Sequence, residues 1–218
     1  MDQSKHGRPT VGLVALLMAG LLAWPSVGLA QLGGILQPAG SSSTGITGDA
    51  TAVRATLLGA LGFLSNTTSL SDTGTLAGTD VAREASQVTG TVPSLLDAEV
   101  LHATTIAWPD EVDSEASLAN LNLSLAGIGI TADSVLAQAS QVAGAAGTGT
   151  STIDNLLING TPIDITGSPN QVVAIPGGQI VINEQTISST GTAVVNALHV
   201  TIAGVADVVI ASATAGIS

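Results

Sequence analysis

The strongest constraint on the fold is a two-residue alternation of apolar and polar side chains. It is clearest in Leu121–Leu125 (LNLSL) and in Leu198–Ile202 (LHVTI). Side chains of a β-strand point alternately to its two faces, so this pattern predicts strands with one face in a core and the other in water. Turn sequences separate such segments, among them Asn159-Gly160, a dipeptide typical of tight hairpins. The chain is therefore predicted to be all-β.

Both alternating segments belong to a longer internal similarity. Leu121–Gly127 (LNLSLAG) and Leu198–Gly204 (LHVTIAG) match in pattern, and each is followed by an Ala-Asp pair and a second apolar segment. Two copies are too few for an array of stacked repeats. They predict two long hairpins within one antiparallel β-sandwich or jelly-roll, with a β-solenoid as the alternative. By the same similarity Asp133–Ser140, whose composition also suits a helix, is predicted to be a strand.

Residues 1–30 have the three features of a signal peptide for export. Met1–Thr10 is basic, Val11–Leu22 is an almost unbroken apolar segment, and Gly28–Ala30 places small residues where a signal peptidase cleaves. The apolar segment is shorter than the roughly 20 residues of a lasting membrane span. These features predict a signal-peptide helix that is removed between Ala30 and Gln31. An uncleaved N-terminal anchor is the alternative.

The rest of the chain divides into a linker and one domain. Gln31–Gly48 is rich in Gly, Ser and Thr, which favours a flexible linker. Asp49–Ser218 is predicted to form a single β-rich exported domain. Within it Thr51–Leu64 has helix-favouring Ala and Leu but also two glycines, and it is predicted to be a strand. The apolar C-terminal segment Val200–Ser218 alternates like a strand, so no transmembrane domain is expected in the mature chain.

The charge balance narrows the range of partners. Without residues 1–30 the chain keeps 15 of its 16 acids and only two of its four cations, Arg54 and Arg83, which leaves a net charge of −13. Nucleic-acid affinity comes mainly from Lys and Arg, so no nucleic-acid partner is expected. The chain has no Cys, and Phe63 and Trp108 are its only aromatic residues beyond residue 30. These absences exclude thiolate chemistry and argue against an aromatic stacking platform for carbohydrates or an aromatic-rich protein interface.

Eight short segments, taken in order, carry a resemblance to a known family: Leu95–Ile106, Ser114–Leu125, Ile130–Ala139, Ile153–Gly160, Pro169–Ile175, Ile182–Gln185, Asn196–Val200 and Ala206–Ala211. Together they resemble the choice-of-anchor P family of bacterial exported proteins. The resemblance implies a surface-exposed or released β domain without an established catalytic activity, so it transfers no catalytic residue. Two departures are the absence of a recognisable C-terminal anchor, which favours release, and the absence of cysteines near the ends of the two similar hairpins.

The densest group of acids follows Trp108-Pro109. Asp110, Glu111, Asp113 and Glu115 could supply the carboxylate oxygens that Ca²⁺ prefers. Their spacing does not match an EF-hand loop. The group is therefore expected to be a solvated acidic turn between strands, with a structural Ca²⁺ site as the alternative. No other cofactor is expected.

No catalytic motif is recognisable around the two histidines beyond residue 30, His102 and His199. The chain has neither a G-x-S-x-G elbow nor an H-E-x-x-H zinc helix. Both histidines are expected at outward strand positions. A secreted hydrolase that uses acids with His102 and His199 is the alternative, and it would need these groups to converge in a cleft.

Asn183-Glu184-Gln185 and Asn196 form a further polar group near predicted strand ends. Such side chains often bond to the main chain of neighbouring turns. This structural role is expected here, with the lining of a cleft as the alternative.

These observations favour a non-catalytic secreted or cell-surface β domain with a structural, matrix or adhesion-type role. A secreted hydrolase and a Ca²⁺-dependent binding module are the other hypotheses. The expected partner is the cell envelope or a second copy of the chain.

Overall fold

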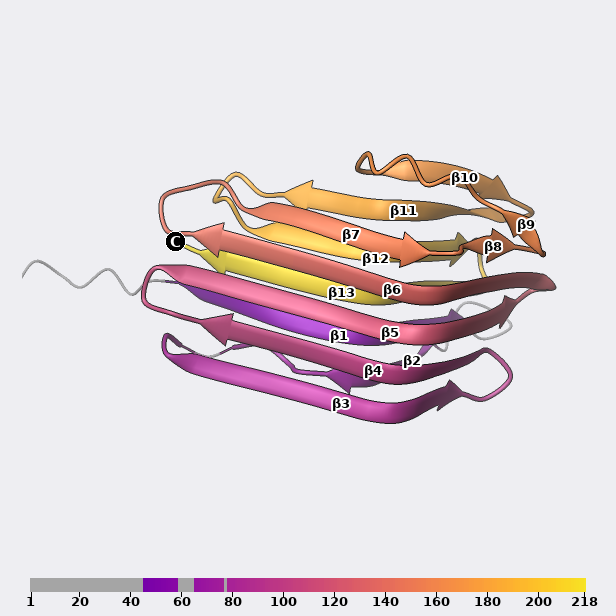
Figure 1. The fold of residues 1–218 in the computed structure, drawn as a ribbon, viewed down its shortest axis with the longest axis horizontal. Helices are drawn as coiled ribbons and strands as arrows, with labels where there is room; N and C mark the ends of the chain where they lie inside the picture. Colours follow the sequence, from indigo (N-terminus) through magenta and orange to yellow (C-terminus); the bar gives the residue numbers. More distant parts are fainter. Residues whose placement is uncertain (1–44, 59–64, 77) are drawn as a thin grey trace, which may run out of the picture. The chain divides into compact units, whose positions relative to one another are not determined.

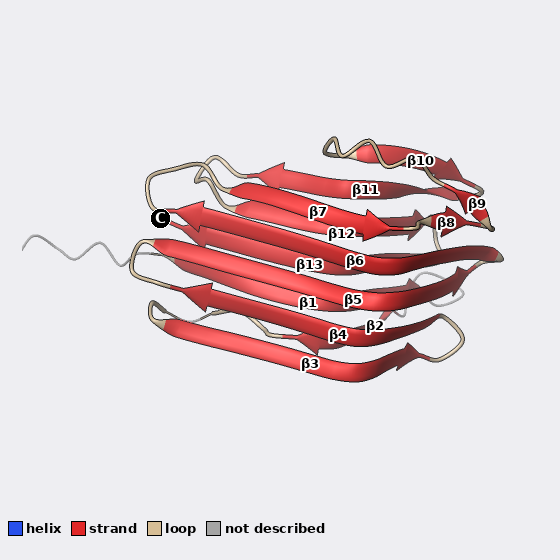
Figure 2. Ribbon diagram, viewed as in Figure 1, coloured by secondary structure: helices blue, strands red, loops and turns tan. Residues whose placement is uncertain are grey.

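The computed structural model describes residues 45–58, 65–76 and 78–218, and within these ranges the ordered elements are strands (Figures 1 and 2). The predicted signal peptide, its cleavage site at Ala30 and Gln31, and most of the predicted linker lie outside the described residues. The strands are β1 Ile46–Leu58, β2 Ser65–Asp72, β3 Val81–Val92, β4 Leu96–Ala107, β5 Glu111–Leu125, β6 Ile128–Val142, β7 Thr148–Asp154, β8 Leu157–Ile158, β9 Thr161–Pro162, β10 Gln171–Ile175, β11 Gly178–Ile187, β12 Ala193–Ile202 and β13 Ala206–Ile217.

The strands form two antiparallel sheets. Sheet A has the order β10-β11-β12-β13-β1-β2, and sheet B has the order β3-β4-β5-β6-β8-β9, with β7 also paired to β6. Most neighbours in a sheet are also consecutive in the chain, and the long-range exception is the pairing of β1 with β13. The predicted antiparallel β-sandwich is thereby confirmed, and the solenoid alternative is not.

The two similar segments form corresponding hairpins, one in each sheet. The first is the β5–β6 hairpin, which turns at Ala126-Gly127, and the second is the β12–β13 hairpin, which turns around Gly204. Strand β13 packs against both β5 and β6 across the sandwich. The similarity therefore marks the centre of the domain, where the two hairpins lie face to face. Asp133–Ser140 is part of β6, as predicted.

The core lies between the sheets and consists of aliphatic side chains. Leu123 and Ile130 of sheet B, and Leu198 and Ile210 of sheet A, have no exposed surface. Alanines fill much of the space between these larger residues. Small side chains allow the two sheets to approach closely, and at Gly149 of β7 an added Cβ would collide with the side chain of Val195 of β12.

Each sheet has irregular positions in the middle of its long strands. In sheet B, Val100 and Asn120 have φ angles of 49° and interrupt the register between neighbouring strands. In sheet A, Asn183 and Ala211 have φ angles of 53° and 51°. Such bulge-like irregularities bend a strand and increase its twist. The long strands of sheet B bend together in Figure 1.

Two predicted boundaries differ from the structure. Strand β1 begins at Ile46, within the segment predicted to be a linker, because residues 46–48 pair with the end of β13. Thr51–Leu58 is a strand as predicted, whereas residues 59–64 lie outside the described part. Residues 45–58, 65–76 and 78–218 contain no helix of sufficient length and hydrophobicity to cross a membrane.

Candidate functional site

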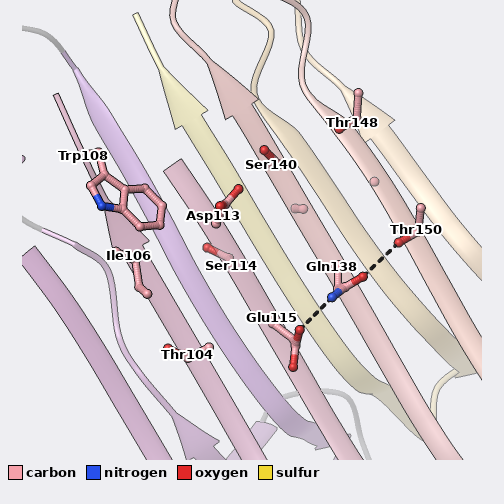
Figure 3. Close-up of a pocket in the computed structure, with 12 residues that line it drawn as sticks. Thr104, Ile106, Trp108, Asp113, Ser114, Glu115, Gln138, Ser140, Thr148 and Thr150 are labelled. Carbon is pink, nitrogen blue, oxygen red and sulfur yellow. Dashed lines mark hydrogen bonds between the residues drawn. The ribbon is translucent and has the colours of Figure 1, made fainter. Parts of the chain in front are cut away.

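An open groove crosses the outer face of sheet B over strands β4 to β7 (Figure 3). Its volume is about 420 Å³, within the usual range for ligand sites. Most of the lining side chains are polar, and one is aromatic. They include Thr104, Trp108, Asp113, Glu115, Gln138 and Thr150.

The strand register brings these side chains together from four strands. Thr104 of β4 pairs with Glu115 of β5, which pairs with Gln138 of β6, which pairs with Thr150 of β7. Directly paired residues point to the same face of a sheet, so the four side chains form one row across the groove. A second row, displaced by two residues, contains Asp113. The groove is thus built on the regular part of the sheet and not on loops.

Two side-chain hydrogen bonds join Glu115, Gln138 and Thr150 of the first row. The Nε2 of Gln138 donates to Oε2 of Glu115 over 2.7 Å, and Oγ1 of Thr150 donates to Oε1 of Gln138 over 3.3 Å. Figure 3 marks these two bonds and none between the other residues it draws. These two bonds set the amide orientation of Gln138.

Trp108 forms the opposite side of the groove from Thr150 (Figure 3). It follows the last residue of β4, and its main-chain N–H donates to the carbonyl oxygen of Glu111 over 2.8 Å. The side chain is 40% exposed, which is unusual for a large aromatic residue. Trp108, one of only two aromatic residues beyond residue 30, therefore has an exposed ring at this groove.

The groove is acidic. Asp113 and Glu115 line it, while the two cations of the described residues, Arg54 and Arg83, lie on β1 and β3 outside the lining. A phosphate, sulfate or carboxylate ligand would meet two negative charges here without a compensating cation. Anionic ligands are therefore disfavoured.

The acidic group of the sequence is arranged differently from the predicted turn. Only Asp110 lies in the turn, whereas Glu111, Asp113 and Glu115 belong to β5 and follow each other on its outer face. Alternate residues of a strand are almost 7 Å apart along the chain, too far for three carboxylates to reach one Ca²⁺ at about 2.4 Å. Within the described residues no three His, Asp or Glu side chains are placed to hold a metal ion.

The two histidines do not converge. His102 lies on β4 in sheet B, with Nδ1 3.7 Å from Oε1 of Glu84, and His199 lies on β12 in sheet A. Neither belongs to the groove lining. A hydrolytic site that combines His102 with His199 is therefore not formed.

His199 is held between two carboxylates on the outer face of sheet A. Its Nδ1 lies 2.9 Å from Oε2 of Glu184, and its Nε2 lies 3.0 Å from Oδ2 of Asp207. The same Glu184 oxygen accepts a 2.6 Å hydrogen bond from Nδ2 of Asn196. Carboxylates can only accept, so both ring nitrogens donate when His199 is the charged imidazolium.

This arrangement favours the charged form of His199. Burial lowers the pKa of its imidazole, but the hydrogen bond to Asp207 and the negative charges of Glu184 and Asp207 outweigh burial and hold the pKa above its usual value of 6.5. A general base needs a free nitrogen lone pair, and here both nitrogens are engaged. The cluster is therefore a hydrogen-bonded cross-strand contact between β11, β12 and β13.

Asn183 and Gln185 have the structural role that the sequence predicts. Nδ2 of Asn183 donates to the carbonyl oxygen of Gly167, and Nε2 of Gln185 donates to the carbonyl oxygen of Gly149. Gln185 also exchanges bonds with Asn170 through its main chain. These amides attach the loop before β10 and the start of β7 to β11. Glu184 instead binds both Asn196 and His199.

A second hollow, also about 420 Å³, lies at one end of the sandwich beside Gln141. This buried side chain donates to the carbonyl oxygens of Ala145 and Thr190 over 2.9 and 3.2 Å, and its Oε1 accepts from the N–H of Ile217 over 2.9 Å. All the polar atoms of its amide are satisfied by the fold. Gln141 therefore ties two turns to the last strand and leaves no group for a ligand.

No protein-family model, no curated protein and no solved structure matches the chain. The resemblance to the choice-of-anchor P family stays a prediction.

Sequence reasoning named Asp113 and Glu115 but missed the other groove residues. Gln138, Thr148 and Thr150 are common polar residues in ordinary alternation, and only the pairing of β5, β6 and β7 brings them together. The one available signal was an isolated Trp in a chain almost free of aromatic residues.

Proposed function

We propose that the protein is an exported, non-catalytic β-sandwich that attaches to material of the cell envelope or extracellular matrix through the groove on sheet B. The signal-peptide features of residues 1–30 and the resemblance to the choice-of-anchor P family support export. The role is that of an adhesion-type or matrix module.

The groove is the observation on which this proposal rests. It is open, it crosses four strands, and its polar side chains are held by a regular sheet. Sites on strands keep their geometry without a ligand, so binding requires little ordering of the protein. An open groove also suits a long polymer better than a small molecule that must be enclosed.

A binding role agrees better with the side chains than a histidine-dependent hydrolysis does. The described lining contains carboxylates, hydroxyls and an amide but neither histidine. The most strongly hydrogen-bonded histidine, His199, has both ring nitrogens engaged on the other sheet. The proposal therefore assigns no catalytic residue.

Fractionation of producing cells tests the proposal. The full chain is expressed with its leader, and the medium, the envelope and the cytoplasm are analysed for the protein and for its N-terminal residue. The expected result is a chain that starts at Gln31 and is found with the envelope or matrix material. The variant Ala30→Arg should block cleavage and increase the retained, longer form, because a signal peptidase needs a small residue there.

Two outcomes would contradict the proposal. One is a wild-type chain that stays in the cytoplasm with Met1 at its N-terminus. The other is a secreted chain that is monomeric and sediments with neither isolated envelopes nor matrix polymers. A chain found free in the medium would still meet the proposal if it binds added envelope material.

A further inference from the structure

The groove has the donors and acceptors that a polyhydroxyl ligand requires. Thr104 and Thr150 contribute hydroxyl oxygens that can accept, since their hydrogens are donated to the carbonyl oxygen of Arg83 and to Oε1 of Gln138. The hydroxyls of Ser140 and Thr148 can both donate and accept. A cationic ligand would use acceptors only, and would leave the hydroxyl hydrogens of Ser140 and Thr148 unused. The mixture of donors and acceptors in the groove therefore matches sugar hydroxyls better than it matches an ammonium group.

Trp108 supplies the apolar part of such a site. The exposed indole stands at one side of the groove, beside Ile106 and Asp113 of the second row and across from Thr150 (Figure 3). The C–H face of a pyranose ring packs well on the face of an aromatic ring, whose π-electrons are negative. The scarcity of aromatic residues excludes a broad stacking platform, but one ring beside a polar floor is enough to place one sugar unit.

The charges of the groove narrow the class of glycan. Asp113 and Glu115 would repel uronic acids, sulfated sugars and phosphate-containing polymers. A neutral sugar instead donates its hydroxyls to these carboxylates, in charge-assisted hydrogen bonds stronger than neutral ones. Since Oε2 of Glu115 already accepts from Gln138, its position is set before a ligand arrives.

The dimensions of the groove suit several sugar units. It extends from β4 to β7, three interstrand spacings of about 4.8 Å or roughly 14 Å in all. This length exceeds one pyranose ring, and the openness of the groove lets a chain continue beyond both sides. We infer that the groove binds a short stretch of neutral polysaccharide across strands β4 to β7, with one sugar ring on Trp108 and the next units on the Glu115–Gln138–Thr150 row.

This inference rests on the proposed function, and it adds the ligand class. The secreted protein is titrated calorimetrically with neutral hexasaccharides of glucose, xylose and mannose, with an oligogalacturonate as the acidic probe and with oligolysine as the cationic probe. At least one neutral probe should bind, with little dependence on salt because no net charge is neutralised. The acidic probe should not bind.

Three groove variants and one matched control connect binding to the site. Trp108→Ala should weaken binding about tenfold or more, which corresponds to 1.4 kcal/mol. Asp113→Asn and Thr150→Ala should weaken it less. Thr152→Ala is the control, because Thr152 is also exposed on the outer face of β7, two residues further along, but lies outside the groove. It should leave the affinity unchanged.

The two proposals can fail separately. Suppose that the wild-type protein binds envelope material, that the neutral probes do not compete for this binding, and that the groove variants do not weaken it. The glycan assignment is then wrong, and the envelope role stands. Salt-sensitive binding of oligolysine alone would also overturn it. If neutral probes bind the groove but the protein never associates with envelope or matrix, the proposed function is wrong and the glycan site stands.

Discussion

Ser114 of β5 donates a 2.6 Å hydrogen bond from Oγ to the main-chain carbonyl oxygen of Thr214 of β13, so one side chain joins the central strands of the two sheets. Its Oγ also lies 2.7 Å from Oγ1 of Thr105, a residue without exposed surface. Because the hydroxyl of Ser114 is used toward Thr214, Thr105 donates to Ser114. This polar pair lies within a mostly aliphatic core.

Ser114→Ala should therefore destabilise the protein by about 1–3 kcal/mol, since the buried hydroxyl of Thr105 loses its acceptor. Denaturant unfolding measures the change. Ser117→Ala, on the outer face of the same strand, should change the free energy of unfolding by less than about 0.5 kcal/mol. Adding Thr105→Val to Ser114→Ala should recover part of the loss, because both partners are then removed. An equal loss for Ser114→Ala and Ser117→Ala would contradict this account.

The His199 cluster should make stability depend on pH. The folded state holds the pKa of His199 above its value in the unfolded chain, so the folded state binds the proton more tightly. The stabilisation is fully present below pH 6.5 and is lost as the pH rises through the folded-state pKa. Urea unfolding at a series of pH values should therefore show falling stability above pH 6.5 in the wild type, and a flatter profile for His199→Gln. Identical profiles would show that the contact does not couple protonation to folding.

Val100 should be a site where substitution stabilises the protein. Its φ of 49° is unfavourable for a β-branched side chain, and its side chain is 63% exposed, so little packing offsets the strain. Val100→Asn should raise the free energy of unfolding by about 1 kcal/mol, since Asn tolerates this conformation. Val88→Asn is the matched control on the neighbouring strand β3, where the side chain is also exposed but the backbone is outside the left-handed region. A gain at Val88 equal to that at Val100 would point to a surface effect unrelated to backbone strain.

Gly149 should not tolerate a side chain. An added Cβ would collide with Val195, whose side chain is fixed in the core. Gly149→Ala should therefore cost about 1–3 kcal/mol, as expected for overpacking. Gly129→Ala on β6 is the control, because the nearest atom to its Cβ would be 3.9 Å away at Asn159. Combining Gly149→Ala with Val195→Ala should restore part of the free energy of unfolding that Gly149→Ala loses, because the colliding side chain is then shortened. If the double variant restores nothing, the loss in Gly149→Ala does not come from this collision.

The sequence predicts the all-β class and the two central hairpins because alternation and turn residues are local signals. The Asn159-Gly160 turn, which joins β8 and β9, belongs to the same category. The contacts of His199 could not be predicted from these local signals. Strict alternation puts Asn196 and His199 on opposite faces of a strand, but β12 is irregular at Ala197 and both side chains point outward.

The groove shows the same limit. Period two places Glu111, Asp113 and Glu115 on one face once the segment is known to be a strand. The segment alone does not exclude the predicted turn, because Asp and, to a lesser degree, Glu are depleted in strands. The pairing of Glu115 with Gln138 and Thr150 depends on the register of three strands, which no single segment encodes.

The emission of Trp108 tests the central claim, that the groove on sheet B is the binding face, most directly. The chain has two Trp and no Tyr, so the secreted protein carrying Trp24→Phe reports on Trp108 alone whether or not its leader is retained. Addition of solubilised envelope or matrix polysaccharide should shift the emission to shorter wavelength, because a ligand on the half-exposed indole removes water from it. The shift should be weaker in Thr150→Ala and unchanged in Thr152→Ala. If the protein sediments with the polysaccharide while the emission of Trp108 does not change, the binding face lies elsewhere and the account is wrong.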